Sequence, residues 1–360
     1  MPMPKPGRKS LVQPATFSPP QAILSPQSWY DVVTLGETMV RLTPPELKRI
    51  EQATTLNIEI GGSESNTAVG LARLGLRVAW LSRLTDNPLG RLIAQTFRGY
   101  GADTSMVSWT EEDRVGLYFL EEGRAPRGSS VTYDRAGSAF SRMQPTDLPA
   151  ELFYSGYARL LHLTGITPAL GSTAAATAWA ALERAKTAGW KISFDLNYRA
   201  RLWTAEQAWQ GCDPFACAAD LLLAPVSDVR LIYNLPPTSS PEQVLQELAQ
   251  LYPQATIVLT LGKEGAIGQE AGGQSCRQSI FPAEEVGRLG GGDAFAAGLL
   301  YGYLQADQKS GEGWLPQALR WGAAMAALKY STPGDMPIIE RPEVEALLAQ
   351  VAPGEIKLRR

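Results

Sequence analysis

Short apolar runs alternate with helical patterns along the chain from Asp31 onward. The runs are rich in leucine and β-branched residues, which favour buried strands. The stretches between them place apolar residues at helical spacing, and several end in glycine, as helix C-termini prefer. The predicted strands are 31–36, 77–84, 158–165, 191–197, 219–225 and 255–262, and the predicted helices are 65–75, 88–101, 172–189 and 241–252.

This alternation predicts an α/β fold, with a doubly wound, mostly parallel sheet and helices on both faces. Continuous apolar strands separated by helices are typical of sheets that are buried on both sides. Ligands of such open sheets bind at the carboxyl ends of the strands, so we expect the chemistry at that edge. No repeat or strong internal boundary is visible, and one domain is expected over residues 31–352.

Two stretches interrupt the alternation, at about 39–62 and 115–135. Both have the pattern of short strands with polar faces and no helix between them. Excursions of this kind from an α/β core often cover the site, so a small β-sheet lid is predicted. An exposed lid sheet could pair with a second copy, which makes a homo-oligomer through the lid one expectation.

The two ends of the chain differ from the rest. Residues 1–30 contain seven prolines and no acid, which predicts a disordered leader, since proline blocks helix and sheet pairing. A transit peptide is also acid-poor, but it should be amphipathic, which these prolines prevent. Residues 353–360 are expected to form a short tail.

Composition excludes several classes of function. The 360 residues carry a net charge of −3, which gives no basic field for nucleic acid or an anionic membrane. No run approaches the roughly 20 apolar residues of a membrane helix. Three cysteines without paired spacing argue against a disulfide framework or structural zinc and suit a cytoplasmic protein. The single histidine, His162, ends a predicted strand and is interpreted as a packed core residue.

The stretch GRLGGGDAFAAGLLYGYL, residues 287–304, carries the strongest chemical signal. Its GGGD sequence, 290–293, follows the strand-like segment 279–289. Gly290, Gly291 and Gly292 can turn their N–H groups toward one point. The N-terminus of the following helix adds partial positive charge, which makes an anion site suited to phosphate. Asp293 would lie in the first turn, facing the same point, as a base for a hydroxyl that attacks phosphorus. The alternative is a glycine-rich turn with Asp293 as an ordinary N-cap.

Together, GGSESNTAVGLARLG (61–75) and GGGDAFAAG (290–298) resemble the two signatures of the PfkB, or ribokinase-like, carbohydrate kinases. The match extends within that family to 2-keto-3-deoxygluconate kinases and covers nearly everything from residue 31 to 350. Further matching motifs are GETMVRLTP (36–44), SRLTDNPLG (82–90), YDRAGSA (133–139), HLTGITPAL (162–170), SFDLNYRARLW (193–203), TLGKEGA (260–266) and LKYSTPGD (328–335). The resemblance implies a ribokinase-like fold that uses ATP and Mg²⁺.

The resemblance assigns catalysis to Asp293 and to the anion hole of Gly290, Gly291 and Gly292, in agreement with the reading from the residues. It assigns sugar binding to Gly61, Gly62 and Asn66. An amide that both donates and accepts suits a polyol, although Asn66 could also cap the helix that begins near Ser65.

Two arginines favour a sugar acid over a neutral sugar. Arg135 lies on the predicted lid and Arg199 follows a core strand, and arginine binds a carboxylate as a planar fork. Without the family context each would be read as a surface ion pair. Tyr133 and Tyr118 are expected to face the sugar as well.

The nucleotide is expected to contact residues after two core strands. Asn197 and Arg199 should reach its phosphates, and Thr260, Gly262 and Gly265 match the family's nucleotide-binding turn. The alternative for that turn is a tight strand-to-helix connection that serves only the fold.

Two departures from the family pattern concern ions. Gly287 stands where the family usually has an aspartate, which makes activation by a monovalent cation doubtful. The segment PVSD, 225–228, stands where many members have an N-x-x-E motif linked to magnesium. Mg²⁺ can still arrive with the nucleotide, and no metal ligands are assigned.

The expected function is ATP-dependent phosphorylation of the terminal hydroxyl of 2-keto-3-deoxygluconate, with the gluconate or galactonate epimer left open. One alternative is a fructokinase or another neutral-sugar kinase. A second is a regulatory member of the fold with little turnover, which the changes at Gly287 and 225–228 motivate.

Overall fold

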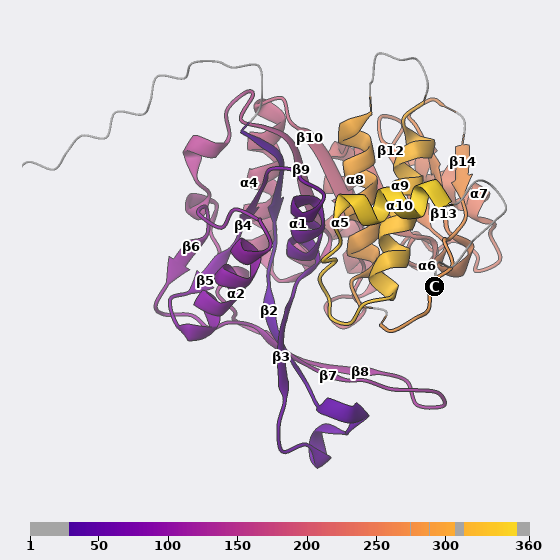
Figure 1. Cartoon of the computed structure of the whole chain (residues 1–360). Coiled ribbons are helices and arrows are strands. Elements are labelled where there is room, and N and C mark those ends of the chain that lie inside the picture. The colour runs from indigo at the N-terminus through magenta and orange to yellow at the C-terminus, as the bar shows by residue number, and fades with distance from the viewer. Residues whose placement is uncertain (1–28, 274, 288, 307–312, 351–360) are drawn as a thin grey trace, which may run out of the picture.

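The computed structural model describes residues 29–273, 275–287, 289–306 and 313–350 (Figure 1). All but the last two residues of the predicted leader lie outside the described residues, and so does the predicted tail. Over the described residues, no helix combines the length and apolar character that crossing a membrane requires.

A central sheet of eight strands forms the middle layer of the described residues, in the order β14-β13-β12-β11-β10-β9-β1-β4. Neighbours from β4 to β12 run parallel, while β13 and β14 are antiparallel additions at one edge. This confirms the predicted mostly parallel sheet. The strands are β1 (Tyr30–Leu35), β4 (Val78–Leu81), β9 (Ala158–Thr164), β10 (Lys191–Asp195), β11 (Leu221–Pro225), β12 (Thr256–Thr260), β13 (Ala266–Gln269) and β14 (Ser275–Gln278).

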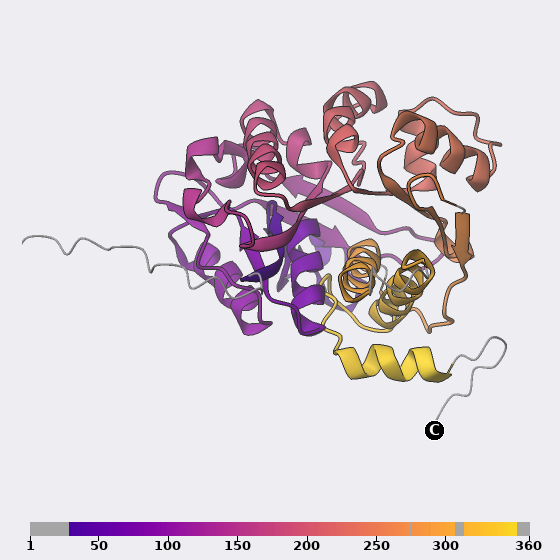
Figure 2. The ribbon, with the colours of Figure 1, turned by 90° about the horizontal axis from the view of Figure 1, so that it is seen from above.

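Helices cover both faces of this sheet, as Figure 2 shows from above. One hydrophobic core joins the sheet to α4, α5 and α7, and the other joins it to α1, α8 and α9. Apolar residues on both faces of the strands explain why each strand reads as a continuous apolar run. The helices are α1 (Ser63–Arg73), α2 (Pro88–Gly99), α3 (Ile166–Ala169), α4 (Ser172–Thr187), α5 (Ala205–Ala218), α6 (Val226–Ile232), α7 (Pro241–Leu251), α8 (Gly291–Gln305), α9 (Leu315–Tyr330) and α10 (Arg341–Gln350).

Local signals fix several helix starts. Asn87 caps α2 by accepting hydrogen bonds from the backbone N–H groups of Leu89 and Gly90, and Ser240 forms a capping box at α7. Helix α8 is buried along residues 294–304, which explains its nearly uniform apolar sequence.

Two predictions about strands were wrong. The segment 77–84 divides into β4 and β5 (Arg83–Thr85), and β5 pairs with β6 (Ser108–Thr110) in a separate small sheet. The segment before the glycines, 279–287, forms no strand. It contains Pro282, which removes a ladder donor, and only Phe281 in it is buried.

The segments at 39–62 and 115–135 contribute to a second sheet of four strands, β3-β2-β7-β8. Its strands β2 and β7 run parallel, and the outer pairs are antiparallel. In Figure 1, β3 and the β7–β8 hairpin extend away from the main body. The strands are β2 (Met39–Thr43), β3 (Asn57–Gly61), β7 (Leu117–Glu121) and β8 (Ser130–Asp134).

Candidate active site

Helix α8 begins at a glycine turn whose shape depends on Gly290. This residue is the N-cap of α8 and has a φ of +73°, in the left-handed region that favours glycine. A Cβ there would lie 1.8 Å from the carbonyl oxygen of Asp335. At Gly292, by contrast, an added Cβ would meet nothing within 4 Å. All three glycines line a cavity, so the start of α8, whose N–H groups lack helical acceptors, faces open space as an anion site requires.

Asp293, in the first turn of α8, is held by two side chains from the first turn of α1. Ser63 Oγ donates a hydrogen bond of 2.6 Å to Oδ1, and Asn66 Nδ2 donates one of 2.8 Å to Oδ2. Burial raises the pKa of Asp293, and the hydrogen bonds from Ser63 and Asn66 oppose that rise. The result is an oriented carboxylate that is more basic than an exposed aspartate.

A cavity of about 290 Å³ lies in front of this carboxylate. Its walls come from the carboxyl ends of β10, β11 and β12 and from the start of α8. It is lined by Asp195, Asn197, Arg199, Leu223, Ala224, Pro225, Thr260, Leu289, Gly290, Gly291, Gly292, Asp293 and Phe295. The structure thus brings together Asp293, the three glycines, Asn197, Arg199 and Thr260 at the edge where the chemistry was expected.

Two further acids act on Asp293, the partly exposed Asp195 and the buried Glu64. Burial, and then the charge of Asp293, raises the pKa of Asp195 to about 7. Burial likewise raises the pKa of Glu64 to about 7, although Thr164 and Thr167 donate hydrogen bonds to it. The charge of Arg199 opposes the rise in the pKa of both Asp195 and Asp293, and the buried Lys329 is a second cation that acts on Asp293.

The residues assigned to the sugar lie where β3 meets α1. Gly61 ends β3, and a Cβ there would lie 2.6 Å from the hydroxyl oxygen of Tyr118. Gly62 is the N-cap of α1. The amide of Asn66 donates to Asp293, while its Oδ1 is buried without a protein partner.

The other three assigned sugar residues lie on or beside the second sheet. The rings of Tyr118 and Tyr133 are 6.0 Å apart. Arg135 forms a largely buried ion pair with Glu37, and its Nε donates to Glu37 Oε2 at 2.9 Å. Arg135 therefore has a carboxylate partner within the protein. The pair is largely buried, which differs from the surface ion pair expected without the family context.

Three residues around this site, Ser63, Asp335 and Arg41, were given no role from the sequence. Ser63 contacts Asp293 directly. The buried Asp335 accepts hydrogen bonds from Tyr118 at 2.7 Å and from Arg41 at 3.1 Å. All three lie within the quoted motifs, but a motif does not show which side chains meet across more than 200 positions of sequence.

The turn after β12 differs from the alternative considered for it. Gly262 and Gly265 both have positive φ and lie at the ends of a single 3-10 turn, Gly262–Glu264, that connects β12 to the antiparallel strand β13. A Cβ at Gly265 would lie 2.0 Å from the carbonyl oxygen of Gln278. Of the three residues assigned here, Thr260 lines the cavity and the two glycines do not.

Metal and histidine chemistry receive little support from the described residues. These contain no group of three or more His, Cys, Asp or Glu side chains placed to hold an ion. Asp228 of the 225–228 segment is partly exposed, and desolvation raises its pKa. Burial lowers the pKa of His162 to about 4, and its Nδ1 lies 3.0 Å from Ser193 Oγ inside the sheet. His162 is therefore the core residue that was predicted.

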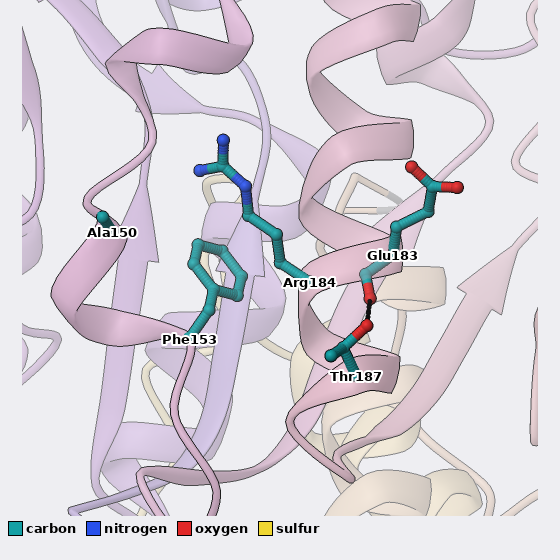
Figure 3. A pocket seen from close by; sticks show the side chains of 5 residues that line it. All are labelled: Ala150, Phe153, Glu183, Arg184 and Thr187. Atoms are coloured by element: carbon teal, nitrogen blue, oxygen red, sulfur yellow. Dashed lines mark hydrogen bonds between the residues drawn. The ribbon is translucent and has the colours of Figure 1, made fainter.

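A second pocket, of about 280 Å³, lies away from these residues (Figure 3). It is lined by Ala150, Phe153, Glu183, Arg184 and Thr187. Arg184 lies over the Phe153 ring and donates to the carbonyl of Pro145, and Thr187 donates to the carbonyl of Glu183. These groups already have partners, and none of the expected site residues is present.

Comparison with known proteins agrees with this architecture. The model of the pfkB family carbohydrate kinases matches residues 30–341. A 2-dehydro-3-deoxygalactonokinase of Haloferax volcanii is 38% identical over 318 residues, which cover 88% of this chain and 96% of that protein. A 2-dehydro-3-deoxygluconokinase of Bacillus subtilis is 29% identical, over 85% and 91% of the two chains.

Solved structures give the same result. A 2-dehydro-3-deoxygluconokinase from Thermotoga maritima superimposes with a TM-score of 0.80 at 34% identity, over 90% of this chain and 99% of that one. The mostly parallel sheet with helices on both faces is therefore the ribokinase-like fold. The chain belongs to the pfkB family of carbohydrate kinases and is an ATP-dependent carbohydrate kinase.

Proposed function

We propose that the protein transfers the γ-phosphoryl group of ATP to the terminal hydroxyl of 2-keto-3-deoxygluconate or its galactonate-derived epimer. The observation that carries this proposal is the position of Asp293. Its partly exposed carboxylate lies beside the glycine turn of α8 and opens onto the cavity at the carboxyl edge of the sheet. The choice of a keto-deoxy sugar acid is supported by the names of the relatives in Haloferax, Bacillus and Thermotoga.

In the proposed reaction, Asp293 accepts the proton of the substrate hydroxyl while its oxygen attacks the γ-phosphorus. The bond from that phosphorus to the oxygen bridging to the β-phosphate breaks, and ADP leaves. The N–H groups at the start of α8 stabilise charge on the transferring group, and Arg199 adds a fixed positive charge. The raised pKa of Asp293 favours proton acceptance.

The cavity suits a nucleotide bound with Mg²⁺. Its glycine turn leaves backbone N–H groups beside open space at Gly292, where phosphate oxygens can bind. Mg²⁺ usually takes one or two carboxylates together with substrate phosphates, and Asp195 and Asp228 are the carboxylates near the cavity edge. The ion would neutralise charge on the phosphates. Activation by a monovalent cation is not part of the proposal, because Gly287 provides no carboxylate.

The second sheet is proposed to act as a lid that binds the sugar acid. Tyr118, Tyr133 and Arg135 come from this sheet and its flank, while Asn66 offers a buried acceptor from α1. Arg135 is paired with Glu37, so binding of the substrate carboxylate would exchange one acid partner for another. Closure would exclude water and so suppress hydrolysis of ATP. A homo-oligomer formed through this sheet remains part of the proposal.

The test is a coupled ADP-release assay with both sugar-acid epimers, fructose and ribose. We expect turnover on a sugar acid, and a loss of about 10²–10⁴ in kcat for Asp293→Asn with ATP binding retained. Asp86→Asn is the matched control, because it changes only a surface ion pair with Arg91. Turnover on fructose alone would overturn the substrate. ATP binding without turnover on any sugar would favour the regulatory alternative.

A further inference from the structure

We propose that Ser63 is a positioning residue for the base. With Asn197 it forms a directional chain of hydrogen bonds that keeps Asp293 charged and oriented toward the acceptor hydroxyl. This inference rests on the proposed function, in which Asp293 accepts the proton. It adds a residue to which neither the sequence motifs nor the comparisons give a role.

The direction of the chain follows from its end group. Asn197 Nδ2 lies 2.7 Å from Ser63 Oγ, and Ser63 Oγ lies 2.6 Å from Asp293 Oδ1. The amide nitrogen can only donate, so the serine oxygen accepts there, and its single proton is left for Asp293. An oxygen that accepts a short hydrogen bond from a fixed donor is disfavoured as a protonation site. The chain therefore stabilises the carboxylate form.

The same arrangement leaves room for the substrate proton. Asn66 donates to Oδ2 as Ser63 donates to Oδ1, so each oxygen of Asp293 has one donor from α1. A carboxylate has about four acceptor positions, which leaves others for the incoming hydroxyl. An amide does not take up a proton at neutral pH, so the chain ending at Asn197 holds charge on Asp293 without carrying the proton away.

Ser63 is held in place through its neighbours in the sequence and in space. The next residue, Glu64, accepts from Thr164 at 2.8 Å and from Thr167 at 2.9 Å, which ties the start of α1 to the end of β9 and to α3. On the other side, the backbone N–H of Asn197 donates to Asp195 Oδ1 at 3.0 Å. The turn that carries Ser63 and its donor Asn197 are therefore both tied to the carboxyl edge of the sheet.

Removal of the Ser63 hydroxyl should change the pKa of Asp293 strongly and the binding of ATP and sugar only weakly. A hydrogen bond to a charged group contributes about 1.5–3 kcal/mol, which corresponds to one to two pH units in a pKa. For Ser63→Ala we expect kcat at pH 7 to fall by at most about tenfold to hundredfold, the limit that a shift of one to two pH units sets, with KM values for ATP and sugar changed less than about threefold. The acidic limb of the kcat profile should move upward by about one to two units, with activity partly restored at pH 9.

Ser65→Ala is the matched control. Ser65 is a buried serine in the same turn, and it donates to the carbonyl of Gly62 and accepts from Thr38 without contacting Asp293. The acidic limb of the kcat profile of Ser65→Ala should lie at the same pH as that of the wild type. Asn197→Gly is a second variant, because glycine tolerates the φ of +39° found there. It keeps the serine hydroxyl but frees its orientation, so it should give a smaller upward shift than Ser63→Ala.

The outcomes separate this inference from the proposed function. An active Asp293→Asn enzyme would overturn the role of the base itself. An inactive Asp293→Asn enzyme together with an unshifted limb in Ser63→Ala would overturn only the chain from Asn197. An equal shift in Ser65→Ala would also overturn it, since any loss of a hydroxyl from α1 would then suffice. If Ser63→Ala does not fold, an unshifted limb in Asn197→Gly decides against the proposal.

Discussion

Glu64 is a buried carboxyl group whose protonation should be coupled to stability. Burial raises its pKa to about 7, well above the ordinary value near 4.5. Because the folded pKa is the higher one, its favourable contribution is fully present below about pH 4.5 and is lost as pH rises through 7. Glu64→Gln resembles the neutral form, so its stability relative to wild type should improve by up to about 3 kcal/mol between pH 4.5 and pH 8.

Urea unfolding of both proteins across this pH range measures the effect. Glu183→Gln, an exposed position on α4, is the control and should give a difference that does not change with pH. If the unfolding free energies of wild type and Glu64→Gln change with pH in parallel, Glu64 has the same pKa in the folded and unfolded states.

At the residue scale, the sequence predicted side chains that lie in recognisable local patterns. Asp293 follows three glycines and opens an apolar helix, and the structure brings it into one cavity with Asn197, Arg199 and Thr260. Ser63 could not be assigned in this way. A serine that opens a helix is usually a cap, and its partner Asp293 lies 230 positions away. Only the folded chain shows that this hydroxyl contacts a carboxylate.

At the element scale, two glycines at the start of α8 are needed for different reasons: Gly290 for folding and Gly292 for phosphate binding. Gly290→Ala should destabilise the protein, because it needs a left-handed conformation and would place a Cβ 1.8 Å from the Asp335 carbonyl. We expect a loss of at least 1–3 kcal/mol. Gly292→Ala meets no atom within 4 Å, so it should fold normally but crowd the phosphate site.

Thermal unfolding and ATP titration of the two variants test this contrast. Gly290→Ala should lower Tm by several degrees, whereas Gly292→Ala should keep the wild-type Tm and bind ATP at least tenfold more weakly. Wild-type affinity in Gly292→Ala would show that the phosphates do not approach this turn.

Elements whose apolar residues recur at regular helical spacing were predicted well, and elements without such spacing were not. The predicted helices 65–75, 88–101, 172–189 and 241–252 correspond to α1, α2, α4 and α7, with ends that differ by only one or two residues. Helix α9 was not assigned, because it is buried on most sides and its alanine-rich sequence has no polar face. The segment 279–289 was read as strand-like, but its described residues 279–287 pair with no strand.

At the scale of the whole molecule, a buried ionic cluster joins the second sheet to the main body. Arg41 of β2 donates to Asp335, which follows α9, and it also pairs with Glu59 of β3. Tyr118 of β7 donates to the other oxygen of Asp335. The backbone of Asp335 in turn borders Gly290, so the sheet proposed as a lid is connected to the glycine turn through one residue.

Arg41→Met should therefore weaken both the fold and the reaction. It leaves the buried Asp335 carboxylate without its hydrogen-bonded cation, with Lys329 as the remaining positive charge that acts on it. Breaking a buried pair typically costs about 3–5 kcal/mol, which in a chain of this length should lower Tm by roughly 4–8 °C. Arg114→Met is the matched control, because Arg114 pairs with Asp134 in an exposed ion pair beside the same sheet and should shift Tm by about 2 °C at most. Asp335→Asn added to Arg41→Met removes the unpaired charge and should recover part of the lost stability. Equal Tm changes in the two arginine variants, or no recovery in the double variant, would mean that the second sheet is held to the body by its apolar contacts instead. A recovered Tm with kcat still reduced would show that the ionic contact also orients the glycine turn for phosphoryl transfer.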